Sequence, residues 1–109
     1  MIADEIRTVL KKRSETDDEW TYGVEQCWQK EIEILSRNMD ETISFLENDC
    51  TADEFSWLSE VFDDVAEKTQ SRLFVDALHR VARKFPEECK KYYIDRVLQY
   101  ADGALLDAD

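Results

Sequence analysis

Gly23, Pro86 and Gly103 are the only glycines and proline in a chain of 109 residues. An all-β sandwich or barrel needs Gly- or Pro-containing turns between its short strands, at intervals of about 8–12 residues. This chain cannot supply them, whereas helices need such residues only at their ends. The sequence therefore predicts an all-α protein, and its length predicts one domain, residues 1–109, with a single hydrophobic core.

Apolar residues recur at steps of three and four along most of the chain, which is the spacing of amphipathic helices. A first helix is expected to end near Arg13, because the basic residues 11–13 suit a helix C-terminus. Residues 16–19 have the Thr-x-x-Glu form of a capping box and predict a second helix. Trp20 and Trp28 lie on its apolar stripe, so we expect both in the core.

The stripe of the second helix continues as far as Leu46, past a second residue that fits a helix start. This residue is Asn38, which Glu41 follows at the spacing of a cap. One long helix and two shorter ones are both compatible with the stripe, and we favour a break near Asn38. Thr51 to Glu54 form the clearest capping box and predict a helix over residues 52–67.

Ser71 is placed to cap a further helix, which Pro86 prevents from continuing unbroken. Pro86 itself suits the first turn of a last helix ending before Gly103, and residues 104–109 are expected to form a frayed tail. The chain thus predicts five or six antiparallel amphipathic helices. They can close into a compact bundle or stack like a short HEAT or armadillo repeat, and the sequence leaves both arrangements open.

The acidic residues are concentrated in one stretch. Between Asn38 and Glu67 the chain has ten carboxylates and no Lys, Arg or His. The net charge of −12 argues against nucleic acid and anionic membrane as ligands, and it favours a cationic partner. Neither a secretory leader nor an apolar run of membrane-spanning length is visible, so we expect a soluble cytoplasmic protein.

On a helix over residues 52–67, a phase of about 100° per residue separates an apolar side from an acidic side, with Trp57 at the edge. A tryptophan beside carboxylates is a common anchor in protein interfaces, because its ring supplies desolvated contact area while the acids pair with Lys or Arg. The predicted partner-binding residues are Asp53, Trp57, Glu60, Val61, Asp63, Asp64 and Glu67. The alternatives are an acidic side that only keeps the protein soluble, and a Trp57 that packs under a neighbouring helix.

No motif for catalysis, for a cofactor or for a metal stands out. The three cysteines form no C-x-x-C pair, and we expect reduced thiols. Asp76 and His79 supply one acid-x-x-His spacing where a di-iron bundle needs two, so His79 is expected on the surface. Tyr92, Tyr93 and Tyr100 crowd the last helix, and one or two of these rings are expected to reach a partner or solvent. We therefore expect no enzyme, no cofactor and no metal site.

Four short segments, residues 51–54, 58–64, 68–71 and 85–88, carry a resemblance to a known family. The stretch that contains them, from Asp40 to Ile94, resembles small bacterial immunity proteins that neutralise toxin domains of contact-dependent growth inhibition and related polymorphic toxin systems. The resemblance covers about half the chain. Its motifs belong to a helical scaffold and carry no catalytic chemistry.

The resemblance implies an all-helical protein that binds one cognate toxin domain, often a nuclease, and blocks its active site in the producing cell. Nuclease sites present Lys, Arg and His for phosphate, so an acidic surface would complement them and speed the encounter. An EndoU-type ribonuclease domain is the expected target. The alternatives are an acidic mimic of nucleic acid that inhibits DNA-binding proteins, and a plain helical adaptor domain.

Overall fold

A computed structural model describes residues 2–106 of the chain, and these residues contain helices and no strand. The elements are α1 (Ile2–Glu15), α2 (Thr21–Arg37), α3 (Met39–Asn48), α4 (Ala52–Leu58), the 3-10 turn η1 (Ser59–Val61), α5 (Phe62–Thr69), α6 (Arg72–Ala82), α7 (Pro86–Lys91) and α8 (Ile94–Gly103). The all-α prediction is confirmed. The helices outnumber the five or six predicted, because two expected helices are each divided.

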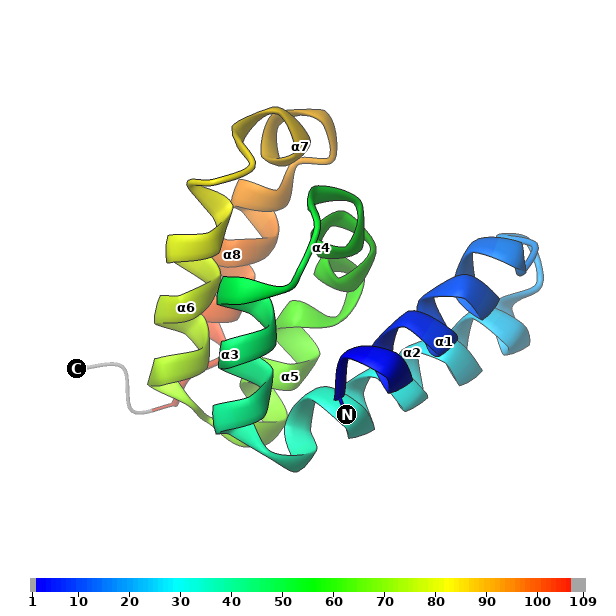
Figure 1. Ribbon diagram of the computed structural model, residues 1–109, viewed down its shortest axis with the longest axis horizontal. Helices are drawn as coiled ribbons and strands as arrows, with labels where there is room; N and C mark the ends of the chain where they lie inside the picture. The colour runs from blue at the N-terminus through cyan, green and yellow to red at the C-terminus, as the bar shows by residue number, and fades with distance from the viewer. Residues whose placement is uncertain (1, 107–109) are drawn as a thin grey trace.

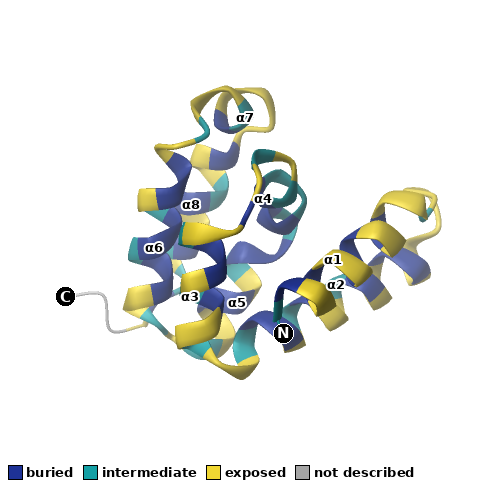
Figure 2. Cartoon of the chain, in the orientation of Figure 1, coloured by how far each residue is buried: buried dark blue, intermediate teal, exposed yellow. Residues whose placement is uncertain are grey.

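The helices surround one core. α1 and α2 form an antiparallel hairpin that projects to one side of the other helices (Figure 1). α3 packs on α6, α5 packs on α8, and α4 with η1 lies between these helices and the hairpin. A single buried cluster takes residues from every helix from α1 to α8, and the buried positions face inward along each helix (Figure 2). The helices therefore close into a bundle.

Three predicted caps start helices as expected. The Asn38 side chain accepts a hydrogen bond from the Glu41 backbone amide at 3.2 Å, so the break near Asn38 is confirmed. Thr51 forms a two-way capping box at the start of α4. The Ser71 hydroxyl accepts from the Phe74 amide at 3.1 Å. In each case a short polar side chain satisfies a backbone N–H that the first helical turn leaves without a partner.

The predicted cap at Thr16 is wrong. The Thr16 hydroxyl donates to a backbone carbonyl of α1 at 2.7 Å, and α2 begins only after Trp20, which makes no side-chain cap. Trp20 is 57% exposed, so the prediction that it lies in the core is wrong as well. Its ring lies against Gly23, where a Cβ atom would approach the ring to 2.3 Å. Glycine at that position leaves room for the ring on the surface of the helix.

The predicted helix over residues 52–67 is interrupted by η1. At Val61, φ is −121° and ψ is 7°, which departs from helical geometry. Val61 and its neighbour Phe62 are both fully buried. In one straight helix their side chains would point about 100° apart, so the interruption allows both to enter the core.

The chain after Pro86 also divides. Pro86 occupies the first turn of α7 as predicted, but α7 ends before Tyr92 and α8 begins after Tyr93. Tyr93 has φ 56°, in the left-handed region that non-glycine residues rarely adopt, and this conformation turns the chain between the two helices.

Residues 104–106 pack on the bundle, so the predicted frayed tail is wrong for them. Leu105 is buried in the core. The Gln70 side chain donates to the Ala104 carbonyl at 2.9 Å and accepts from the Leu106 amide at 2.7 Å. Residues 107–109 of the predicted tail lie outside the described part of the chain.

Candidate partner-binding surface

Three of the ten carboxylates in the acidic stretch are held by arginines from distant parts of the chain. The pairs are Arg80–Glu47 at 3.2 Å, Arg7–Glu54 at 2.7 Å and Arg13–Glu60 at 2.8 Å. Burial works against the charge of Glu54, but hydrogen bonds from Arg7 and Thr51 hold the pKa of Glu54 below its ordinary value. These acids join helices that are far apart in sequence, so they serve the fold.

The most buried of these ion pairs centres on Arg13, which is only 5% exposed. Its guanidinium donates to both carboxylate oxygens of Glu60, at 3.0 and 2.8 Å, and to Asp18 at 2.9 Å. The guanidinium carbon lies 5.1 Å from the ring centre of Trp57, within cation–π range. Trp28 donates its indole N–H to Glu60 at 3.1 Å. Burial alone would lower the pKa of Arg13, but the hydrogen bonds to Glu60 and Asp18 raise it, so the cation stays charged.

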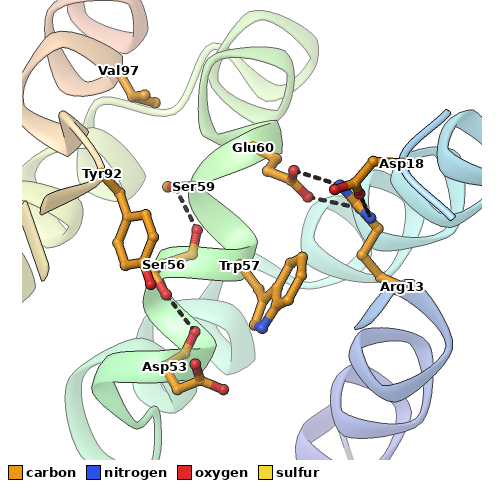
Figure 3. A pocket seen from close by; sticks show the side chains of 9 residues that line it. All are labelled: Arg13, Asp18, Asp53, Ser56, Trp57, Ser59, Glu60, Tyr92 and Val97. Atoms are coloured by element: carbon orange, nitrogen blue, oxygen red, sulfur yellow. Dashed lines mark hydrogen bonds and ion pairs between the residues drawn. The ribbon is translucent and has the colours of Figure 1, made fainter. Parts of the chain in front are cut away.

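A hollow of about 410 Å³ opens beside this ion pair. It is lined by Arg13, Asp18, Asp53, Ser56, Trp57, Ser59, Glu60, Tyr92 and Val97. Glu60 and Asp18 converge on Arg13 at one side, and Tyr92 approaches α4 from the other side (Figure 3). The hollow thus brings together the end of α1, the α4–η1 segment and the α7–α8 turn.

Three predicted partner-binding residues have structural roles. Val61 is fully buried in the core, so its prediction as a surface contact is wrong. Glu60 binds Arg13 and Trp28, and it is therefore no free charge on the surface. Trp57 packs against the core while bordering the hollow, which agrees with the alternative that it packs against neighbouring elements.

The other four predicted acids remain unpaired. We call this set the acidic face: Asp53, Asp63, Asp64 and Glu67. Within the described residues, no basic group lies in ion-pair distance of these carboxylates. Partial burial, with the neighbouring charges of Asp63 and Glu67, raises the pKa of Asp64 above its ordinary value. No basic group within residues 2–106 therefore relieves the repulsion of Asp64 by Asp63 and Glu67.

Exposed tyrosines lie on the helix next to this acidic face. α8 runs beside α5 in the same direction, because Val97 borders the hollow with Ser59 and the chain after α8 is bonded by Gln70 at the end of α5. Tyr93 is 72% exposed at the start of α8, and Tyr100 is 60% exposed further along. The expectation that these rings cannot all be buried is confirmed, while their contact with a partner stays a prediction. Because α5 and α8 run in the same direction, the prediction that the helices are antiparallel is wrong for this pair.

Sequence patterns did not identify Glu31, which lies on α2 near the charges of Arg13 and Glu60. Its side chain is fully buried, and neither carboxyl oxygen has a hydrogen-bond partner among the described residues. Burial and the nearby charge of Glu60 raise the pKa of Glu31 to about 8, although Arg13 acts in the opposite direction. No local signal marks this residue, because it occupies an ordinary charged position beside the apolar stripe of α2.

Neither the histidine nor the cysteines assemble a reactive cluster. His79 is partly exposed, as predicted, and its Nε2 lies 3.0 Å from an oxygen of Asp102. Cys27, Cys50 and Cys89 are buried free thiols. Across residues 2–106, no group of His, Cys, Asp and Glu side chains is placed to hold a metal ion.

The described helices are all too short or too polar to cross a bilayer. No protein-family model, curated protein or solved structure matches the chain at a significant level. The functional argument therefore rests on the surface itself, in which α5 carries acids without an ion-pair partner among the described residues and packs on α8, which carries exposed tyrosines.

Proposed function

We propose that the protein binds a cationic protein domain through the acidic face and the adjoining tyrosines of α8, and that it acts as an immunity protein. The target would be the toxin domain of a polymorphic toxin, and a nuclease of the EndoU type is the favoured candidate. The observation that carries the proposal is the acidic face, whose four carboxylates have no ion-pair partner within residues 2–106, while nearby acids are paired with arginines.

The arrangement has the two components of an effective inhibitor surface. Unpaired carboxylates on a protein of net charge −12 attract a basic partner over several ångströms and raise the association rate. Exposed tyrosines supply contact area at a low cost in side-chain entropy. A nuclease presents cationic groups at its phosphate site, so covering that site with carboxylates would exclude the substrate.

Isothermal titration calorimetry with the toxin domain encoded immediately upstream of the gene tests the proposal. We expect a one-to-one complex that weakens with added salt, because screening reduces attraction between exposed charges. A toxin domain from an unrelated system is the specificity control. No complex at micromolar concentration would contradict the proposal, and equal binding to several DNA-binding proteins would favour the nucleic-acid mimic instead.

A further inference from the structure

The hollow contains more carboxylates than internal cations. Asp18, Asp53 and Glu60 border it, and Arg13 is the one cation among its lining residues, which leaves a net charge of −2. This excess of negative charge beside a protein surface favours an additional cation, because opposite charges attract more strongly there than in bulk water.

The bound guanidinium of Arg13 shows which cation suits these surroundings. Both carboxylate oxygens of Glu60 accept hydrogen bonds from it, and its central carbon lies 5.1 Å from the centre of the Trp57 ring. Both contacts exploit the planar, forked shape of guanidinium, which an ammonium group does not share. Tyr92 adds a second aromatic ring at the hollow, and the Lys91 ammonium lies 5.2 Å from the centre of that ring. The Asp53 carboxylate is exposed there and has no ion-pair partner among the described residues.

We propose that the hollow receives an arginine side chain of the cationic partner, with Asp53 and the outer oxygen of Asp18 as its carboxylates and Trp57 and Tyr92 as its aromatic walls. This inference rests on the proposed function for the identity of the partner. The volume of about 410 Å³ lies within the usual range of ligand pockets, about 300–1,000 Å³. The incoming side chain would occupy the open part of the hollow while Arg13 keeps its place against Glu60.

The test uses a small probe and needs no partner protein. N-acetyl-arginine amide is titrated into the full ¹⁵N-labelled chain, and the Trp57 indole N–H resonance is followed by NMR. N-acetyl-lysine amide and N-acetyl-citrulline amide are the controls, because the first lacks the planar group and the second lacks the charge. We expect saturable shifts at millimolar concentration for the arginine probe, and clearly weaker binding for both controls.

A matched pair of variants separates local pairing from overall charge. Asp53→Asn and Asp40→Asn each remove one carboxylate from the second residue of a helix, in α4 and α3 respectively. Only Asp53 borders the hollow. Asp53→Asn should weaken the arginine probe about threefold, the size expected for one partly exposed charge pair, while Asp40→Asn should leave it unchanged.

The outcomes distinguish this inference from the proposed function. Equal shifts with arginine and citrulline, equal binding by the two variants, or no saturable shift at all would each overturn the arginine site. A toxin domain that binds Asp53→Asn and the parent chain equally well would also overturn it, and would leave the immunity function standing. Binding of the probe without binding of any toxin domain would support the site and reject the immunity function.

Discussion

Glu60 and Asp63 are three residues apart in the same acidic stretch, yet they have opposite surroundings. Glu60 accepts three hydrogen bonds from Arg13 and Trp28, whereas Asp63 has no ion-pair partner among the described residues. The contrast extends to Glu47 and Glu54 on one side and the rest of the acidic face on the other. The three acids that join helices are paired with arginine, whereas Asp63, Asp64 and Glu67 have no ion-pair partner among the described residues and lie on α5, which packs on α8. Charge density alone does not separate these two roles.

Glu31 is the extreme case, because it is fully buried, whereas the paired acids are partly exposed, and its carboxyl oxygens have no hydrogen-bond partner among the described residues. Since burial raises its pKa from 4.5 to about 8, the folded protein keeps a proton that the unfolded chain releases above pH 4.5. The protonated Glu31 therefore costs the folded protein no stability below about pH 4.5, and the free energy of unfolding falls as the pH rises from there to about 8. At about 1.4 kcal/mol per pKa unit, the loss of stability is on the order of 5 kcal/mol.

Glu31→Gln removes this titration. Urea unfolding of the variant and the parent chain from pH 4.5 to 9 should give stabilities that diverge in favour of the variant as the pH rises. Arg13 and Glu60, the charged groups near Glu31, stay in place in both chains. Parallel stability curves would show that Glu31 is ionised or solvated in the folded protein.

Arg13→Ala should be the next largest effect, a loss of about 3 kcal/mol, because it leaves Glu60 partly buried without its cation. Arg37→Ala is the control, since the Arg37–Glu5 pair is exposed and such pairs contribute at most about 1 kcal/mol. Thermal or urea unfolding measures both. If the two replacements lower the stability by the same amount, the ion pair at Arg13 does not hold the hairpin to η1.

Replacing a single acid should change stability in opposite directions for the acids paired with arginine and for the acids of the acidic face. Glu54→Gln should destabilise by about 1 kcal/mol, because it weakens the bonds to Arg7 and to the Thr51 amide. Asp64→Asn should stabilise by a few tenths of a kcal/mol, since it removes a charge whose partial burial, together with repulsion from Asp63 and Glu67, raises the Asp64 pKa. Chemical denaturation at low salt measures the stability of both variants. A loss of stability in both would contradict the distinction between acids paired with arginine and acids of the acidic face.

Features that depend on a few neighbouring residues were predicted correctly from the sequence. The caps at Asn38, Thr51 and Ser71 each need one polar side chain and an amide three residues later. Pro86 starts a helix because its missing N–H would have no partner there in any case. The all-α fold follows from the sum of such local signals.

Features that depend on distant residues were missed. Arg13 matched the basic end of the first helix, but its burial depends on Glu60, which lies 47 residues further along the chain. The apolar stripe of residues 52–67 fits a straight helix, and only packing in the bundle bends it at Val61. The predicted partner-binding set agrees with the structure in part. Its four acids of the acidic face have no ion-pair partner among the described residues, whereas Glu60 is paired with Arg13 and Val61 is buried.

The association rate with the cognate toxin domain tests most directly that the unpaired acids of α5 serve a basic partner. Asp63→Asn with Asp64→Asn is compared with Asp40→Asn with Glu41→Gln, since both pairs remove two acids from the same first-turn positions, of α5 and α3 respectively. Stopped-flow mixing should give association about tenfold slower, with a weaker salt dependence, for the α5 variant only. Equal rates for the two variants, with circular dichroism unchanged, would contradict the account.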